Sequence, residues 1–317
     1  MPEITYRQTI HTRGNNMKIN VIDYRGGSDY AEHHLKCPVI NSRGDSLFSY
    51  RTKYFKKMQR DFRFWKEQGH EFICYTQHKY SLDDHKHFDQ VIECEQMPCH
   101  DARNRILEDT PQGEWIGIWD NDATLYWDKL RSDKLPQELE AVCKQAQEQG
   151  IVSYVPFNSQ QAPYPIDLDC TEWTFRPTIH QKGTMMFVQN IGVKWPTHLN
   201  SMSDLARAIE LTKQGHKTAQ LQQASLNEYA NTKSTIFRVN AYHVQYQQPG
   251  PNADPMGMLK WDSQSDRKEK YTEAKQQIES DYNSTLPELQ QEQNLLWKQP
   301  EMFDELFDVI QPFNEQN

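Results

Sequence analysis

The sequence has no long apolar run and little cysteine. Its longest apolar stretches, such as the one from Trp115 to Trp119, are far shorter than the roughly 18 residues that a membrane helix needs. The first residues contain no apolar core of a signal peptide. Six cysteines are spread over 317 residues without a C-x-x-C pair, so no disulfide framework is expected. These absences predict a soluble, cytoplasmic protein with free thiols, no membrane partner and no obligate protein partner.

An excess of basic residues is also absent. The chain has 35 Lys and Arg against 44 Asp and Glu, a net charge of -9, which argues against a general polyanion binder. The acidity is concentrated in residues 264–317, which hold twelve acidic and five basic side chains. Residues 42–70 hold eight basic and three acidic side chains. The net charge therefore does not exclude a local basic face that contacts phosphates, such as those of DNA. A solvated surface helix is the alternative.

Strands and helices are expected to alternate along the first third of the chain. Apolar runs predict strands at 17–24, 70–77, 90–94 and 114–119, and amphipathic spacing predicts helices at 45–68 and 100–109. The strand at 114–119 is apolar at almost every position, as in a parallel sheet that is covered on both faces. The alternation therefore predicts an α/β fold with a mostly parallel central sheet flanked by helices.

The remaining chain is expected to add helices at 135–149 and 203–214 and strands at 151–157, 185–189 and 236–245. Residues 81–87 are expected to form a polar turn. His85 and His87, beside Asp83 and Asp84, are of the residue types that bind metals, but without an apolar frame around them we expect exposed loop residues. We expect three parts: an N-terminal arm at 1–16, one α/β domain at 17–263 and an acidic helical C-terminal extension at 264–317.

The strand at 114–119 runs directly into Asp120, Asn121 and Asp122. Open α/β sheets place their ligands beyond the carboxyl ends of their strands. Mg²⁺ and Mn²⁺ are commonly held by one or two carboxylates, with substrate phosphates completing the shell. The tripeptide thus predicts a site for a divalent cation and a diphosphate, and an ordinary polar turn after a strand is the alternative.

The residues before this turn strengthen the metal interpretation. The chain reads Ala102-Arg103-Asn104, then Gly113-Glu114, then the apolar strand, then Asp120-Asn121-Asp122. This order and spacing resembles the signature of GT-A-type nucleotide-sugar glycosyltransferases. The resemblance is close over residues 99–123 and extends over 17–98 only in the order of the strands.

The resemblance implies a GT-A-like (Rossmann-like) domain with a UDP-sugar as the donor substrate and Mn²⁺ or Mg²⁺ as the cofactor. Asp120 and Asp122 would hold the metal, and Arg103, Asp120 and Asn121 would contact the nucleotide sugar. Arg103 suits this role because it lies near a helix start, where backbone N–H groups favour anions. A salt-bridged surface pair of Arg103 and Asn104 is the alternative.

Two later positions also match the family. Asp204, at the start of the helix at 203–214, resembles the catalytic base of inverting members, and a carboxylate there can accept a proton from the acceptor hydroxyl. The match departs from the usual Glu-Asp pair because Ser203 precedes Asp204, and helix capping explains Asp204 nearly as well. His243 resembles the family's occasional third metal ligand, and a structural histidine is the alternative.

The strand ends nearest the expected site supply the candidate nucleoside contacts. Tyr24 and Arg25 end the first strand, and Tyr75 and Thr76 end the second. An aromatic ring there can stack on uracil, and packing or turn roles are the alternatives.

The segment 173–187 is where the family builds its acceptor wall, and it supplies Trp173, Arg176, Lys182 and Gly183 as candidate acceptor contacts. Its aromatic and basic groups suit a sugar or a nucleobase. The segment is similar to a branch of glycosyltransferases, many from phages, that modify hydroxymethylated pyrimidines in DNA. That similarity implies glucosyl or arabinosyl transfer to 5-hydroxymethylcytosine, in the host cytoplasm if the protein is phage-encoded. A polysaccharide, lipid-linked glycan or protein acceptor and a non-catalytic binding module are the alternatives.

Overall fold

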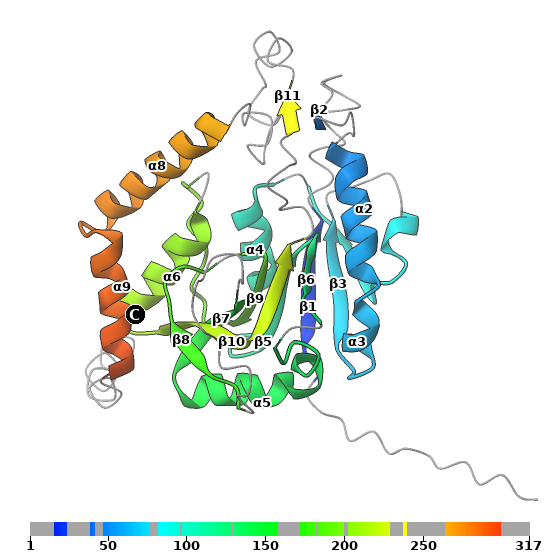
Figure 1. Ribbon diagram of the computed structural model, residues 1–317, viewed down its shortest axis with the longest axis horizontal. Helices are drawn as coiled ribbons and strands as arrows, with labels where there is room; N and C mark the ends of the chain where they lie inside the picture. The colour runs from blue at the N-terminus through cyan, green and yellow to red at the C-terminus, as the bar shows by residue number, and fades with distance from the viewer. Residues whose placement is uncertain are drawn as a thin grey trace, which may run out of the picture.

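The computed structural model describes residues 16–23, 39–41, 47–76, 82–95, 97–127, 130–157, 172–181, 183–199, 202–228, 237–239 and 264–298. The chain forms a mixed α/β fold with a central sheet flanked by helices (Figure 1). Within the described ranges, none of the helices combines the length and the apolar character needed to cross a bilayer.

The strands of the central sheet are β1 Lys18–Asp23, β3 Glu71–Thr76, β4 Gln90–Glu93, β5 Trp115–Asp120, β6 Ala123–Leu125, β7 Ile151–Phe157, β8 Phe175–Pro177, β9 Met185–Gln189 and β10 Lys217–Glu228. The short strands β2 Val39–Asn41 and β11 Phe237–Val239 pair separately. The helices are α2 Leu47–Gln59, α3 Phe62–Lys66, α4 Cys99–Glu108, α5 Leu135–Glu148, α6 Ser203–Lys213, α8 Gln264–Asp281 and α9 Leu286–Lys298, with a 3-10 turn, η1, at Leu82–His85.

The sheet order is β4-β3-β1-β5-β9-β7-β10-β6, with β8 against β10. Strands β4, β3, β1 and β5 are parallel, and β9 is antiparallel to both β5 and β7. From β1 the chain moves outward to β3 and β4 and then returns to β5 on the other side of β1. Open α/β sheets bind ligands at such a reversal, beyond the carboxyl ends of the strands.

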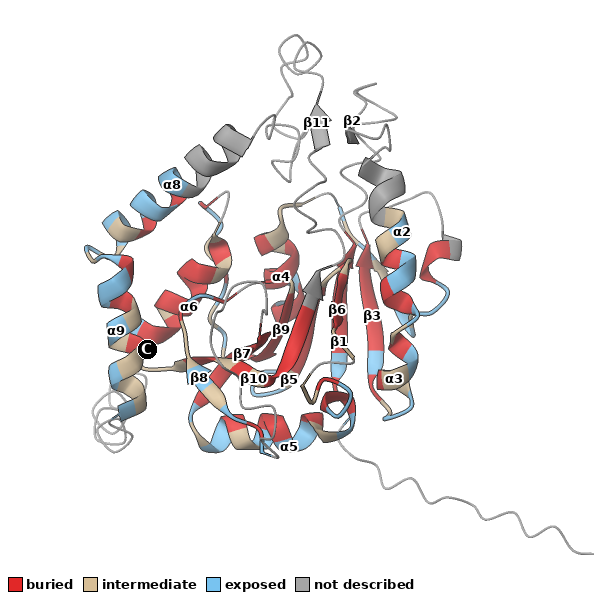
Figure 2. Ribbon diagram, viewed as in Figure 1, coloured by how far each residue is buried: buried red, intermediate tan, exposed pale blue. Residues whose placement is uncertain are grey.

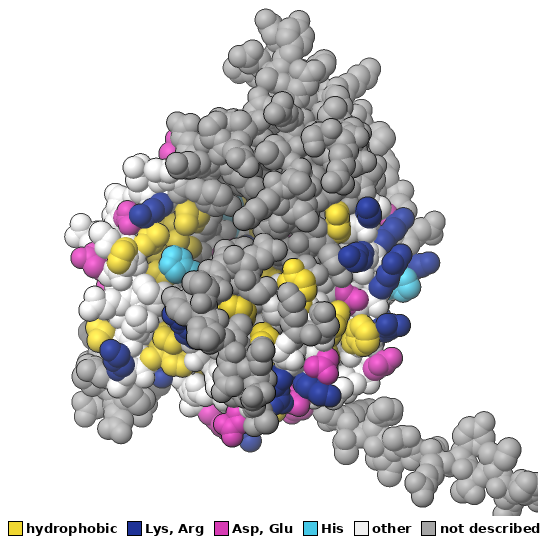
Figure 3. Space-filling view, in the orientation of Figure 1, with side chains coloured by type: hydrophobic (Ala, Val, Ile, Leu, Met, Phe, Trp, Pro, Cys, Tyr) yellow, Lys and Arg dark blue, Asp and Glu magenta, His cyan; other side chains and the backbone are white. Residues whose placement is uncertain are grey.

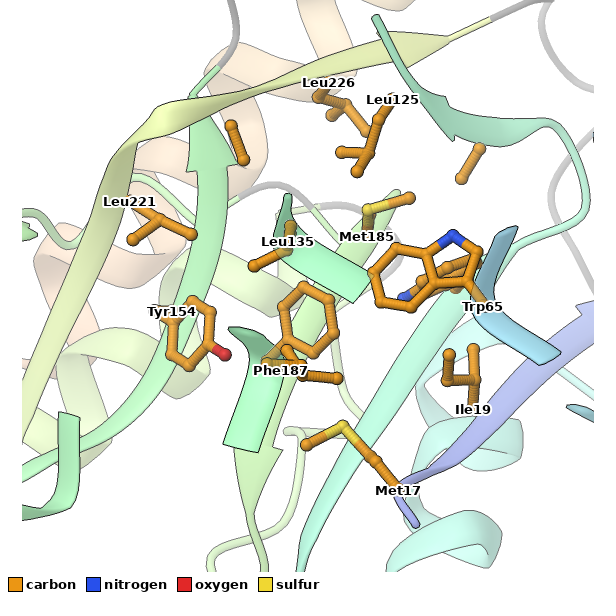
Figure 4. Close-up of a cluster of buried hydrophobic side chains, with 14 of the residues drawn as sticks. Met17, Ile19, Trp65, Leu125, Leu135, Tyr154, Met185, Phe187, Leu221 and Leu226 are labelled. Carbon is orange, nitrogen blue, oxygen red and sulfur yellow. The ribbon is translucent and has the colours of Figure 1, made fainter. Parts of the chain in front are cut away.

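Apolar residues cover both faces of the sheet because successive strand residues point to opposite sides. In β3, Phe72 and Cys74 join one core cluster, and Ile73 and Tyr75 join the other. Figure 2 shows the buried strands between helices with exposed outer faces. The first cluster lies under α2, α3 and α5, and Figure 4 shows its centre, where Trp65 and Phe187 meet. The second cluster lies under α4.

The predicted α/β class and its parallel first half are confirmed, and several elements differ from the prediction. The short strands β2, β6 and β8 were not predicted, and of the strand predicted at 236–245 the structure describes Phe237–Val239 as β11, while 240–245 lie outside the described residues. The helix expected at 45–68 is two helices, and Asp61 at the break accepts a hydrogen bond from Thr124 Oγ1. Strand β5 is parallel only to β1, because β9 runs against its other edge. Strand β10 was not predicted, since its Gln-rich sequence hides a buried row of small and apolar residues.

The helices α8 and α9 lie in the segment predicted as a helical extension, and α9 packs on the α/β part of the chain. Ile278, Leu286 and Leu289 form a third core cluster with the apolar face of α6. Gln293 Nε2 donates to Thr212 Oγ1 on α6 at 2.8 Å. Figure 1 shows α8 and α9 on the side of the molecule opposite to α2 and α3.

Candidate active site

Arg103 connects two carboxylates that are distant in the sequence. It lies in α4, and its side chain is 4% exposed because Ala102 and Ile106 turn the same helix onto the core. Its Nη2 lies 3.4 Å from Oδ1 of Asp120, and its Nη1 donates to Oδ1 of Asp204. The alternative interpretation, a salt-bridged surface pair of Arg103 and Asn104, does not hold, because both residues are buried.

The turn Asp120-Asn121-Asp122 is fixed on both sides. The backbone N–H of Asp120 donates to the carbonyl oxygen of Thr184 at 2.8 Å, and β6, which begins directly after the turn, pairs with β10. The side chain of Asp120 is 26% exposed, and Asp122 is half-buried. Two carboxylates with part of their surface in solvent are thus held at the end of β5, beside the β1–β5 reversal.

Asn121 points away from these carboxylates, toward the end of β1. Its Nδ2 donates to Oδ1 of Asp23 at 3.4 Å, and Thr76 Oγ1 and His85 Nε2 lie 3.3 and 2.9 Å from the other oxygen of Asp23. The expectation that His85 is an exposed loop residue is wrong, because it is 3% exposed and contacts Phe55 edge-on. His87 is exposed as expected.

This network also contains a group of atoms with the chemistry of metal ligands. The ligand atoms of Asp23, Cys74 and His85 all lie within 4.8 Å of one another. The direct bond between Asp23 and His85 already engages the facing atoms of that pair. We therefore interpret the group as a buried hydrogen-bond network that holds Asn121, and through it the turn.

Asp204 lies in the first turn of α6, but it does not cap that helix. The N-cap position is Met202, in the left-handed region at φ 59°, and no side chain bonds there. The carboxylate of Asp204 instead accepts hydrogen bonds from three other segments: from Arg103, from Trp195 Nε1 at 2.9 Å and from the Gly183 N–H at 3.0 Å. Helix capping therefore does not explain this residue.

Other predicted residues lie elsewhere. Tyr75 is buried under α4, where its hydroxyl donates to Asp109 at 3.2 Å, and burial raises its pKa above the usual value. To stack on a base, the Tyr75 ring would have to leave the second core cluster, in which it is buried. Trp173 packs in the first core cluster, with its Nε1 donating to Glu138 at 2.6 Å, and Arg176 lies on β8 beside β10.

Four predicted site residues lie outside the described part of the chain: Tyr24, Arg25, Lys182 and His243. Their roles in nucleoside, acceptor and metal binding stay predictions. Among the acceptor candidates that the structure describes, Trp173, Arg176 and Gly183, it places Gly183 against Arg103 and Asp204.

Three residues around Asp120 and Asp204 were not predicted from the sequence: Asp23, which bonds to Asn121, Trp195, which bonds to Asp204, and Arg207, whose guanidinium lies over the Trp195 ring. Asp23 carried a usable signal, because it is a carboxylate at the end of an apolar strand. Trp195 lies in a loop without periodicity, and Arg207 lies on a helix face that otherwise reads as apolar, so neither had a local signal.

The sequence matches no model of a known protein family and no curated protein. The solved structures that this chain resembles include TarS, a mannosyltransferase and GalNAc-T7. TarS of S. aureus in complex with UDP has 11% identity and a TM-score of 0.40, over 66% of this chain and 60% of that one. Mannosyltransferase PcManGT from Pyrobaculum calidifontis, in complex with GDP-Man and Mn²⁺, has 11% identity and a TM-score of 0.45, over 84% and 75%.

The third, GalNAc-T7 with UDP, GalNAc and Mn²⁺, has 9% identity and a TM-score of 0.41, over 92% of this chain and 57% of that one. The chain thus spans about three-fifths of the TarS and GalNAc-T7 chains that it matches. Similarity at this level does not assign an activity, so the function is inferred from the site itself.

Proposed function

We propose that this protein is a metal-dependent glycosyltransferase of GT-A-like architecture, which moves a sugar from a nucleoside diphosphate to an acceptor hydroxyl. The position of Arg103 carries the proposal. Its guanidinium meets Asp120 at the end of β5 and Asp204 at the start of α6. A strand-end carboxylate and a helix-start carboxylate are thereby held together beside the β1–β5 reversal, where such sheets bind ligands.

Asp120 and Asp122 fit a divalent cation. Both are partly exposed, and their oxygens are the ligand type that Mn²⁺ and Mg²⁺ prefer. A bound cation would supply Lewis-acid stabilisation of the departing nucleoside diphosphate. Asn121 holds Asp23 instead, so its contribution to the site is to fix the turn.

Asp204 is proposed as the base. Its carboxylate would accept the proton of the acceptor hydroxyl while that oxygen bonds to the anomeric carbon and the bond from this carbon to the phosphate breaks. Attack from the side opposite the leaving group would invert the anomeric centre. Arg103 would bind the diphosphate, because its guanidinium offers several N–H donors in a fixed plane. The family resemblance favours UDP as the nucleotide and leaves hexosyl and pentosyl donors open.

The test is sugar transfer, or hydrolysis of the nucleotide sugar, with Mn²⁺ and a panel of UDP-sugars. We expect Asp122→Asn to lose about 100-fold or more of the rate because a charged ligand is removed. The matched control is Asp133→Asn, whose carboxylate is 52% exposed and pairs only with its neighbour Lys134 among the described residues.

A second readout does not depend on turnover. Mn²⁺ with UDP should stabilise the wild type against unfolding by about 2.7 kcal/mol at 100 times the Kd, and Asp122→Asn should lose this gain. Activity and stabilisation that survive unchanged in Asp122→Asn would contradict the metal role. Binding without turnover in the wild type would favour a non-catalytic nucleotide-sugar module.

For the acceptor, we propose 5-hydroxymethylcytosine in DNA. The supporting observation is a basic face on α2 and α3, where Figure 3 shows Lys and Arg side chains gathered. The exposed basic residues of this face are Lys53, Lys56, Lys57, Arg60 and Arg63. Of these, Lys56 pairs with Asp84 at 2.7 Å. Such a face suits the phosphate backbone, whose binding weakens steeply with salt.

The test compares DNA that contains 5-hydroxymethylcytosine with unmodified DNA, followed by digestion and weighing of the nucleosides. We expect a gain of one sugar mass on the modified DNA alone. The double variant Lys53→Glu/Arg60→Glu should weaken DNA binding and flatten its salt dependence, whereas Lys144→Glu, at an exposed lysine of α5, should not. No mass gain with any UDP-sugar would contradict the DNA acceptor and leave glycan, lipid-linked or protein acceptors.

A further inference from the structure

Asn104 belongs to the Ala-Arg-Asn motif, yet the proposed chemistry gives it no task. Its side-chain amide makes two hydrogen bonds to the backbone of one distant residue. The N–H of Trp195 donates to Oδ1 of Asn104 at 2.7 Å, and Nδ2 of Asn104 donates to the carbonyl oxygen of Trp195 at 3.0 Å. Two bonds to one residue fix both its position and its orientation, as in a pair of β-strand residues.

The side chain of Trp195 reaches the proposed base. Trp195 is 1% exposed, and its Nε1 donates to Oδ1 of Asp204 at 2.9 Å. An indole N–H is a donor only, so it orients a carboxylate without competing for the proton. Because the ring is buried, its N–H is also out of reach of a phosphate group in solution.

Arg207 contacts the indole ring of Trp195. It lies three residues after Asp204 on α6, and its guanidinium lies 4.2 Å from the centre of the Trp195 ring. Its Nε donates to the carbonyl oxygen of Val193 at 3.1 Å. Neither Nη atom has a hydrogen-bond partner among the described residues. Burial lowers the pKa of Arg207 to about 9.

Arg103 has two roles in the proposed function, one toward Asp204 and one toward the diphosphate of the donor. It bonds to Asp204, and the proposed function requires the same guanidinium to meet the diphosphate of the donor. When Arg103 turns to the donor, the remaining described donors to Asp204 are Trp195 Nε1 and the Gly183 N–H. Of these two donors, the indole is the side-chain donor, and it carries no charge.

We propose that Trp195 is a positioning residue, which fixes the direction in which Asp204 presents its carboxylate to the acceptor hydroxyl, and that Asn104 and Arg207 hold the indole in place. This inference rests on the proposed role of Asp204 as the base. It gives the asparagine of the motif a function in acceptor activation, separate from donor binding.

The test is Trp195→Phe, which removes the N–H and keeps a ring against Arg207. We expect kcat for sugar transfer to fall by at least about tenfold, as for a misplaced catalytic group. The Kd for UDP with Mn²⁺ and the KM for the donor should change by less than about twofold, because the donor contacts are intact. Trp115→Phe is the matched control, since its indole N–H has no partner among the described residues and it lies at the opposite end of β5.

A second pair of variants separates positioning from folding. Asn104→Ala should reproduce the loss in kcat although it does not touch Asp204, and adding it to Trp195→Phe should cost little more. An unchanged kcat in Trp195→Phe, in a wild type that transfers sugar, would overturn the positioning role alone. A loss of donor affinity equal to the loss in kcat would also overturn it. A wild type that transfers no sugar would overturn the proposed function first.

Discussion

The backbone N–H of Gly183 donates to Oδ2 of Asp204 at 3.0 Å, and there is no space for a side chain at this position. A Cβ atom on Gly183 would overlap Nη2 of Arg103 and Oδ2 of Asp204. Glycine is required here by close approach and not by its backbone angles, because residue 183 is not among the glycines with positive φ.

Gly183→Ala is therefore expected to displace Arg103 and Asp204 together and to lower kcat about 100-fold. Gly150→Ala is the control: its φ is +71°, and nothing lies within 4 Å of its added Cβ. It should cost about 1 kcal/mol of stability from the left-handed backbone and leave kcat unchanged. Steady-state kinetics and urea unfolding of both variants measure the difference, and full activity of Gly183→Ala would contradict this geometry.

We expect Arg207 to lower the free energy of unfolding while it supports catalysis. Its guanidinium is fully buried, and both Nη atoms are unpaired among the described residues. Replacing a buried, poorly compensated charge with an apolar side chain of similar length is often stabilising. We expect Arg207→Met to raise the free energy of unfolding by about 1 kcal/mol and to lower kcat.

The control for this variant is Arg105→Met. Arg105 is 56% exposed and pairs with Asp109 in the same helix, so its removal should change stability by no more than about 0.5 kcal/mol. Denaturant unfolding measures both variants. A clear loss of stability in Arg207→Met would show that the cation is needed for folding.

We expect His85 to stabilise the fold near the turn Asp120-Asn121-Asp122. Its Nε2 lies 2.9 Å from Oδ2 of Asp23, and both side chains are almost completely buried. Removing the imidazole leaves a buried carboxylate with one partner fewer, so His85→Leu should cost about 3 kcal/mol. His87→Leu, at an exposed neighbour, should stay within about 0.5 kcal/mol. Equal unfolding midpoints for the two variants would contradict the network.

His70 should make the protein less stable in mild acid. Its Nδ1 accepts the Met17 N–H at 3.3 Å and its Nε2 donates to the carbonyl oxygen of Pro136 at 2.8 Å, so the fold holds the neutral ring. Burial lowers the pKa of His70 below the ordinary 6.5, and the unfolded chain therefore binds this proton first. The stability that the neutral His70 ring contributes is therefore fully present above about pH 6.5 and is lost as the pH drops through the lower folded pKa.

Urea unfolding at about pH 7.5 and about pH 5 measures this loss. His70→Gln should show a smaller drop between the two pH values than the wild type, and His87→Gln should show the same drop as the wild type. An identical drop in all three proteins would show that His70 does not contribute.

The parts predictable from the sequence are those with a local signal. β7 and β9 begin and end where their apolar runs do, and α4 and α5 match their predicted ranges within a residue or two. Strand β10 was not predicted because the burial of Gln223 and Ser225 depends on partners from other segments. The Asp120 turn and Arg103 were predictable from their order, but Trp195 was not, since its neighbours are supplied by α4 and α6 and leave no trace in its own sequence.

The packing of α6 against α9 has a consequence for how the protein is made. The apolar face of α6 buries Leu205, Ala206 and Ile209 in one cluster with Ile278 of α8 and Leu289 of α9. A chain growing on the ribosome contains Arg103, Asp120 and Asp204 long before it contains α8 and α9. Until then this apolar face has Ile179 and Leu199 of the cluster beside it but lacks the residues that α8 and α9 supply. Assembly of the site would thus be a late event of synthesis, and a nascent chain that stops before α9 would contain each of these residues while α6 still lacks its support.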